Sequence, residues 1–249
     1  ALNSAEAMKL KKASEKYPGK LFFRHNRRFE PAFTHIREIM ASGVLGEVYE
    51  IQLRRYSYSR RDDWQTIIDC GGGMLNNWGP HLVDHALQLL ESPVKDIWSD
   101  LKKVSAVGDA EDHFKFILRG KNGRILDVEV GGGAAAYLPA YTVLGTRGAL
   151  TCDEREIKIR HIDPAQKLAR ISAKRQSPPV NGCFGNAETL KWVEKTLKVD
   201  PAAKCDMHHI WKYLYQSIRK GKSFPIKTDE AVEVVKTTEK IKKLSGFFK

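Results

Sequence analysis

A hairpin pattern near the middle of the chain limits its possible folds more than any other feature. Residues 113–118 and 125–130 alternate apolar and polar side chains, with the period of two expected of a strand buried on one face. Between them stands Asn122-Gly123, a pair typical of a tight hairpin turn. Further short strands fit 47–58, 94–105, 140–144, 149–152 and 156–161. Consecutive strands joined by tight turns predict a large antiparallel sheet.

The remaining segments have helical periodicity, so the predicted fold class is α+β: a large, open, mainly antiparallel sheet with helices on one face. Helices are expected at 4–16, from Pro31 to Gly43, after the glycines at 71–73 as far as Leu90, and in three segments around 192–197, 210–220 and 229–244. A short apolar strand is expected at 20–26, which would complete an α/β unit with helix 4–16.

The formal net charge is +12, from 42 Lys and Arg against 30 Asp and Glu. Such a charge can indicate nucleic-acid binding, but acidic residues are interleaved along most of the chain. The densest lysine groups, at 9–12 and 236–243, fall on predicted helices, where a solvated basic face is expected. We expect no nucleic-acid partner, and attraction of an anionic ligand stays open.

No window approaches 18 consecutive apolar residues, so no membrane-spanning helix and no membrane partner are expected. The first residues lack the charged and apolar regions of a signal peptide. The four cysteines, Cys70, Cys152, Cys183 and Cys205, are scattered and form no CxxC pair. This argues against zinc ribbons and disulfide scaffolds and favours reduced thiols in a cytoplasmic protein.

The stretch from Gly71 to Leu90 is the best candidate for chemistry. On a helix, Leu75, Trp78, Leu82, Ala86 and Leu89 form an apolar stripe, and Asn77, His81, Asp84, His85 and Gln88 lie opposite. Pro80 is tolerated if Asn76 or Asn77 caps the helix. His81 then lies near the first turn, where the helix dipole should lower its pKa toward a neutral imidazole that accepts a proton.

The three glycines before this helix, Gly71 to Gly73, permit close approach of a ligand or of another chain segment, and a flexible loop is the alternative. His81 and His85 also have the i, i+4 spacing of a zinc-binding helix. The HExxH pattern is absent, and a third ligand would have to be Asp84 or His113, so we expect no metal. The cluster from Cys205 to His209 is interpreted as capping and surface chemistry.

Several motifs together resemble the Gfo/Idh/MocA oxidoreductases. They are Arg24-His-Asn-Arg-Arg-Phe-Glu-Pro31, Ser42-Gly-Val-Leu-Gly-Glu47, the Gly71 to His81 stretch with Asp84, Tyr141 to Leu150 with Gly145-Thr-Arg-Gly148, and the tail from Thr228. The resemblance runs essentially from Ala1 to Phe248. The glycine run with His81 and Asp84 is its most specific part.

The resemblance implies an NAD- or NADP-dependent dehydrogenase or reductase acting on a sugar or cyclic polyol. In that family a Rossmann domain precedes a substrate domain whose sheet face pairs subunits. The family's phosphate loop and Glu-Lys-Pro segment have no counterpart here, so the chain resembles a C-terminal portion that would be inactive alone. Residues 1–29 would be the residual piece of the Rossmann domain, and 30–249 the substrate-binding and oligomerisation domain.

Carried over residue by residue, the resemblance makes His81 the proton acceptor or donor during hydride transfer, with Asn77 standing where the family often has Asp. The other expected site residues are Trp64, Tyr56, Arg28 and Asp84 for substrate and Arg27 and Gly72 for cofactor. Two alternatives stay open. One is a non-catalytic, basic ligand-binding or scaffold protein, which the Asn77 departure fits. The other is a glycoside-cleaving relative that uses NAD in a transient redox cycle.

Overall fold

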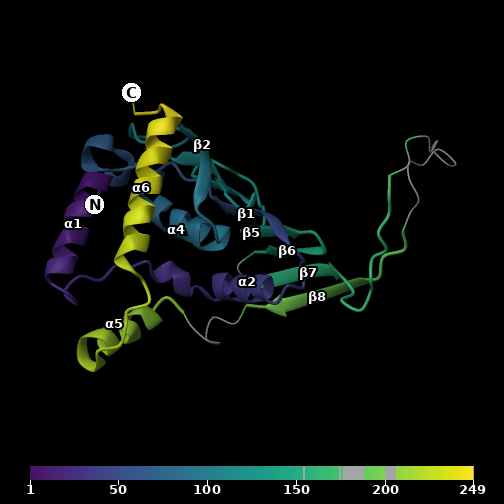
Figure 1. Cartoon of the computed structure of the whole chain (residues 1–249). Helices are drawn as coiled ribbons and strands as arrows, with labels where there is room; N and C mark the ends of the chain where they lie inside the picture. The colour runs from purple at the N-terminus through teal and green to yellow at the C-terminus, as the bar shows by residue number, and fades with distance from the viewer. Residues whose placement is uncertain (154, 174, 176–187, 200–205, 249) are drawn as a thin grey trace.

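An eight-stranded sheet forms the body of the structure (Figure 1). The computed structural model describes residues 1–153, 155–173, 175, 188–199 and 206–248. The strands are β1 (Val48–Tyr56), β2 (Val94–Lys102), β3 (His113–Gly120), β4 (Ile125–Gly131), β5 (Tyr141–Gly145), β6 (Gly148–Cys152), β7 (Glu156–Ile162) and β8 (Trp192–Lys198). Their order is β2-β3-β4-β1-β5-β6-β7-β8, and the β1–β4 pair alone is parallel among these neighbours. The predicted open, mainly antiparallel sheet is confirmed.

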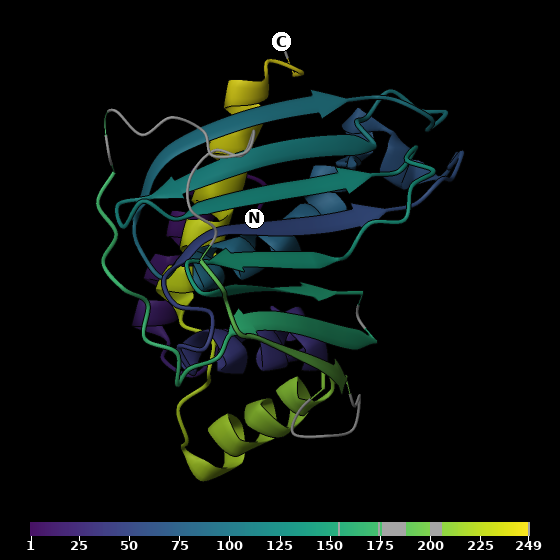
Figure 2. The ribbon, with the colours of Figure 1, turned by 90° about the vertical axis from the view of Figure 1, so that its right-hand side faces the viewer.

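The helices pack against one face of this sheet, and the other face carries none of those described (Figure 2). The α-helices are α1 (Ser4–Lys16), α2 (Pro31–Ala41), α3 (Met74–Asn77), α4 (Gly79–Leu90), α5 (His209–Lys220) and α6 (Thr228–Ser245), and the 3-10 turns are η1 (Asn26–Phe29), η2 (Trp64–Thr66) and η3 (Ile68–Cys70). Helix α6 packs against β2, α4 and α1. Over the described residues, no helix is long and apolar enough for a bilayer crossing.

The core lies between the helices and the inner face of the sheet. Alternate residues of β3 and β4, such as Phe114, Phe116 and Val128, are fully buried and meet Phe33 of α2 and Leu82 of α4. Burying a side chain of this size contributes about 1.5–3 kcal/mol. The period-two pattern that predicted these strands therefore also fixes which of their faces is covered.

Two predicted elements are wrong. The segment around 192–197 was expected to be a helix, but it is strand β8, which pairs antiparallel with β7 from Ile162↔Trp192 to Glu156↔Lys198. A seven-residue run with Trp, Val and Thr suits an edge strand as well as a helix, and the free edge of β7 decides between them. Residues 21–25 form no strand, because no described segment pairs with them.

The helix expected from the glycines to Leu90 is divided in two at Trp78. Pro80 has no N–H, so the hydrogen bond that would continue α3 into α4 is missing. Neither asparagine caps α4: its N-cap is Trp78, with no side-chain hydrogen bond, and the Trp78 carbonyl accepts from the N–H of His81 at 3.1 Å. The break leaves His81 at the start of a fresh helix.

A buried ion pair holds α4 in place. The Arg28 guanidinium of η1 donates from Nε to Oδ2 of Asp84 at 2.7 Å and from Nη2 to Oδ1 at 2.6 Å. Its third nitrogen donates to Oε2 of Glu230 on α6. The side chains of Arg28 and Asp84 are only 8% and 2% exposed. One guanidinium thus joins η1, α4 and α6.

His85, one residue further along α4, is fully buried and also bridges segments. Its Nε2 lies 2.9 Å from the carbonyl oxygen of Arg27, and its Nδ1 lies 3.2 Å from the hydroxyl of Tyr141 on β5. The ring stacks on Phe33 at 3.9 Å between centroids. The polar side of α4 predicted from sequence therefore includes two buried side chains, Asp84 and His85, which tertiary partners satisfy.

Replacing Arg28 by Met should destabilise the protein by about 3–5 kcal/mol, because the Asp84 carboxylate is left buried without a partner. The double variant Arg28→Met with Asp84→Leu should recover most of this loss. Arg119→Met is the matched control, since Arg119 and Asp96 form an exposed pair and its removal should cost less than about 1 kcal/mol. Urea denaturation measures all three. Equal losses for the buried and exposed pairs would contradict this account.

Stability should fall on acidification, in part through His85. Burial lowers the pKa of His85 to about 3 in the folded protein. The unfolded imidazole gains its proton below about 6.5, so between these values the unfolded state binds more protons and acid favours it. The contribution is roughly 3 kcal/mol by pH 4. Denaturation of His85→Gln should show a shallower loss between pH 7 and 4, whereas His208→Gln, at an exposed site, should keep the wild-type slope.

Candidate active site

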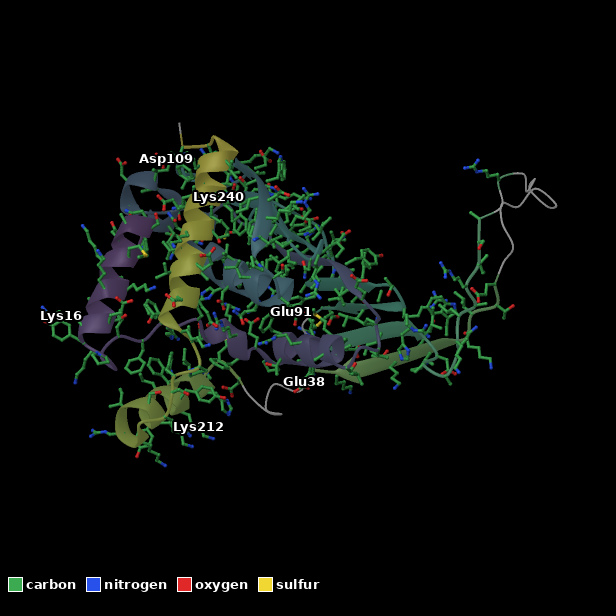
Figure 3. The ribbon with its side chains drawn as sticks, viewed as in Figure 1. Lys16, Glu38, Glu91, Asp109, Lys212 and Lys240 are labelled. Carbon is green, nitrogen blue, oxygen red and sulfur yellow. The ribbon has the colours of Figure 1, made fainter. Side chains whose placement is uncertain are left out.

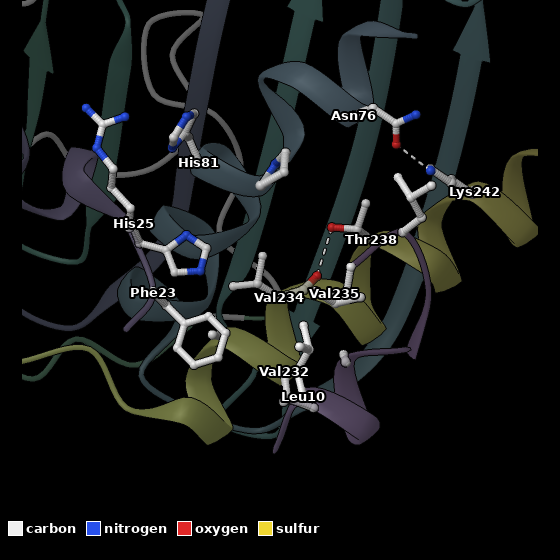
Figure 4. A pocket seen from close by; sticks show the side chains of 16 residues that line it. Leu10, Phe23, His25, Asn76, His81, Val232, Val234, Val235, Thr238 and Lys242 are labelled. Atoms are coloured by element: carbon white, nitrogen blue, oxygen red, sulfur yellow. Dashed lines mark hydrogen bonds between the residues drawn. The ribbon is translucent and has the colours of Figure 1, made fainter. Parts of the chain in front are cut away.

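His81 lies in a cavity of about 280 Å³ (Figure 4). The cavity is formed by α1, the 23–25 segment, the α3–α4 region and α6. Its apolar lining includes Leu10, Phe23, Val232 and Val235. Its polar lining includes Arg24, His25, Asn76, His81 and Lys242. Segments far apart in the sequence thus meet around one imidazole.

The His81 imidazole is neutral near pH 7 and has an unpartnered ring nitrogen. Its Nδ1 is buried and has no hydrogen-bond partner among the described residues. Burial lowers its pKa to about 4, with further lowering by the positive charges of Arg27 and Arg24 and by His25, while Asp84 opposes the shift. The neutral form predicted from sequence is therefore supported, but burial is the main cause rather than the helix dipole.

Asn76 and Lys242 form a second polar group in the same cavity. Nζ of Lys242 donates to Oδ1 of Asn76, and Nδ2 of Asn76 donates to the carbonyl oxygens of Gly71 and Gly72 at 3.0 and 2.8 Å. These bonds fix the direction of the amide, so its oxygen faces α6. Burial lowers the pKa of Lys242.

The glycine run lies against the chain itself. The N–H groups of Gly72 and Gly73 donate to the carbonyls of Ile67 and Gln65 at 2.9 and 2.8 Å. A Cβ on Gly72 would lie 2.6 Å from those same oxygens, and one on Gly73 would lie 2.4 Å from Oε2 of Glu111. The sequence predicted that either a ligand or another chain segment approaches these glycines closely. In the structure it is another chain segment. The amides of the run are used internally and form no phosphate cradle, so the prediction for Gly72 gains no support.

Asn77 does not share the His81 cavity. It lines a separate space of about 30 Å³, and its Nδ2 donates to Oε1 of Gln65 at 3.0 Å. Glu111 also lines this space, and burial raises its pKa. One carboxylate oxygen of Glu111 is buried with no partner among the described residues. A cavity of this size suits an ordered water.

None of the other predicted site residues lines the cavity. Arg28 and Asp84 satisfy each other, as described above. Arg27 stacks over Trp78 at 4.2 Å and pairs with Glu30, close enough to act on His81 through its charge. Trp64 is 59% exposed on η2 and does not line the cavity.

Tyr56 lies at the end of β1, beside a hollow on the helix-free face, where burial and Glu129 raise its pKa to about 12. His113 does not line the His81 cavity either, and its Nε2 lies 3.7 Å from Oε1 of Glu129. Among the described residues, no cluster of three or more His, Cys, Asp or Glu side chains suits a metal ion. Cys70 is exposed and Cys152 is buried, and Cys183 and Cys205 lie outside the described residues.

Sequence reasoning missed Lys242, His25 and Asn76. Lys242 was assigned to a solvated lysine-rich face, but it follows the buried Thr238 by four residues and therefore lies on the inward side of α6. His25 stands inside the quoted Arg24 to Pro31 motif. For Asn76 no local signal distinguishes it from Asn77, since the break at Trp78 decides which way each amide points.

Comparison with known proteins places this geometry in a family. Residues 33–151 match the model described as the GFO/IDH/MocA C-terminal domain. The chain is 23% identical over 241 residues to scyllo-inositol 2-dehydrogenase (NADP(+)) IolW of Bacillus subtilis (strain 168), covering 94% of this chain and 64% of that protein. It is 33% identical over 127 residues to the uncharacterized oxidoreductase YdgJ of Escherichia coli (strain K12), covering 50% and 36%.

Solved structures show the same fold. An NAD-binding protein from Listeria innocua superposes with a TM-score of 0.78 at 21% identity, covering 98% of this chain and 70% of that one. An oxidoreductase from Thermotoga maritima gives 0.74 at 17% identity, covering 99% and 67%. The chain spans less than two thirds of the length of the curated relatives named above. On the matched domain, residues 33–151 of the chain belong to the C-terminal domain family of the Gfo/Idh/MocA oxidoreductases, and the relatives and the fold agree with this.

Proposed function

We propose that this chain is the substrate-side part of an NAD- or NADP-dependent oxidoreductase acting on a hydroxylated carbon of a sugar or cyclic polyol. The observation that carries the proposal is His81: a neutral imidazole with a buried, unpartnered Nδ1, at the start of a helix and inside a cavity. The name of the Bacillus relative, scyllo-inositol 2-dehydrogenase (NADP(+)), supports the substrate class and the cofactor.

In the proposed reaction the carbinol carbon loses a hydride and its hydroxyl loses a proton, which leaves a carbonyl. His81 takes the hydroxyl proton, and in the reverse direction it returns that proton to the carbonyl oxygen. Burial and the charges of Arg27 and Arg24 disfavour the imidazolium, so His81 passes the proton on to solvent after the step. Arg28 and Asp84 act as positioning residues, because their ion pair fixes α4 relative to η1.

NAD or NADP, when bound, supplies the site that accepts or returns the hydride. The Gly71–Gly73 run forms no pyrophosphate cradle, because its amides are bonded within the chain. Residues 1–29 would belong with the nucleotide-binding part, and 30–249 would form the substrate and oligomerisation part. Packing of α1 on α6 supports a shared boundary along the cavity. The chain alone is then expected to be inactive.

His81→Ala, made in the full-length protein, should lower kcat by about 10²–10⁴-fold, because the hydroxyl proton loses its acceptor. Steady-state kinetics with scyllo-inositol and each nicotinamide cofactor measures the effect. Gln88→Ala, two turns along the same helix, is the control and should keep wild-type turnover. If both variants keep full activity with an intact fold, His81 is not the proton acceptor.

We also propose that two copies pair through the helix-free sheet face. One cross-strand row on this face runs through Trp98, Ile117, Asp127, Gln52, Thr142, Thr151, Lys158 and Thr196. Trp98 is 52% exposed at one end of it. A broad mixed face with an exposed aromatic residue is suited to a partner of the same kind.

Thr142→Glu, at the centre of this row, should shift the full-length protein from oligomer to monomer, because two copies related by a two-fold axis would place like charges together. Light scattering after gel filtration measures the mass. Lys240→Glu on the exposed side of α6 (Figure 3) is the control and should leave the mass unchanged. An unchanged oligomer in Thr142→Glu would show that this face is not the interface.

A further inference from the structure

The charged side chains that line the His81 cavity are all of one sign. They are Arg24 and Lys242, and none of the described residues lining the cavity is Asp or Glu. His25 and His81 add no charge near neutral pH, because burial lowers both pKa values. A partly apolar cavity with two cations and no anion of its own favours a negatively charged occupant.

Lys242 is the less exposed of the two cations. Its ammonium donates to Oδ1 of Asn76, and it forms no ion pair within the described part of the chain. Glu111 and Glu239 face it from the neighbouring loop and from α6, and both act on it at longer range through charge. Glu239 accepts the N–H of Ser4 at 2.8 Å, and Glu111 lies in the separate Asn77 cavity. An ammonium carries three donors, so Lys242 keeps donors for a ligand.

The positions of these groups suggest how one ligand would lie. His81 and Lys242 are on opposite sides of the cavity in the view of Figure 4, with Val234, Val235 and Thr238 of α6 between them and below. A hydroxyl at His81 and an anionic group at Lys242 would therefore belong to the two ends of one small molecule. The apolar lining would contact its carbon chain.

We propose that the substrate is an anionic hydroxy compound, such as a sugar acid or sugar phosphate, and that Lys242, oriented by Asn76, is the specificity-determining residue that binds its oxyanion. This inference rests on the proposed function and narrows its substrate class, sugars and cyclic polyols, to hydroxy compounds of this kind that also carry an anionic group. A carboxylate and a phosphate share the chemistry that Lys242 recognises, namely acceptor oxygens with negative charge.

The test compares three six-carbon ligands, sorbitol, gluconate and sorbitol 6-phosphate, by calorimetric binding to the full-length protein with cofactor. The wild type should bind one of the two anions at least tenfold more tightly than sorbitol. Lys242→Met should weaken that anion ten- to a hundredfold and leave sorbitol unchanged, because one charge-assisted hydrogen bond is lost. Lys242→Arg should keep the preference, and Lys240→Met, exposed on the same helix, should behave as wild type.

Three outcomes would overturn the proposal. They are no preference for either anion over sorbitol, an equal loss for all three ligands in Lys242→Met, and a loss confined to cofactor binding, which would assign the ammonium to the cofactor's phosphates. Binding is also measured in His81→Ala. Retained anion preference there, together with unchanged turnover, would refute the proton-transfer role and leave this inference standing. Lost turnover without any anion preference would do the opposite.

Discussion

The buried pair between Arg28 and Asp84 is the interaction on which the site depends. It fixes α4 against η1 and, through Glu230, against α6. Each of these elements contributes to the cavity around His81 or borders it. A pair this well hydrogen-bonded costs desolvation, so its value lies in specifying one arrangement of three segments rather than in net stability. The neighbouring His85 adds the same kind of constraint between α4, η1 and β5.

The surroundings that this ion pair holds in place keep the His81 imidazole weakly basic. A charged histidine there would repel Arg27 and Arg24 and would lose solvation, so the neutral form dominates at ordinary pH. The break at Trp78 contributes as well, since a new helix, with Pro80 in its first turn, starts just before His81. The local sequence supplies the turn, and the distant ion pair supplies the orientation.

The sheet could be predicted from sequence because its signals are local. Alternation over 113–118 and 125–130 and the Asn122-Gly123 turn act within a few residues, and the resulting strands appear as expected. The errors fall where the deciding partner is remote. Strand β8 needs the free edge of β7, and the burial of Asp84 needs Arg28, which lies 56 residues away. Periodicity on α4 alone could identify a polar side but not its burial.

The same reasoning separates the predicted site residues from those that line the cavity. Motif matching selected His81, because a histidine after glycines at a helix start is a local pattern, and His81 is among the residues that line the cavity. It selected Asn77 by its position four residues before His81, yet the helix break turns that amide toward Gln65 and leaves Asn76 facing Lys242. Lys242 lies 166 residues after Asn76 in the chain. A residue that a distant helix contributes to a site can be predicted only from the periodicity that identifies the inward side of that helix. On α6 this side carries Lys242 among valines and threonines. Asn76 accepts only one of the three donors of this ammonium, so the remaining donors are the ones that a ligand in the cavity would use.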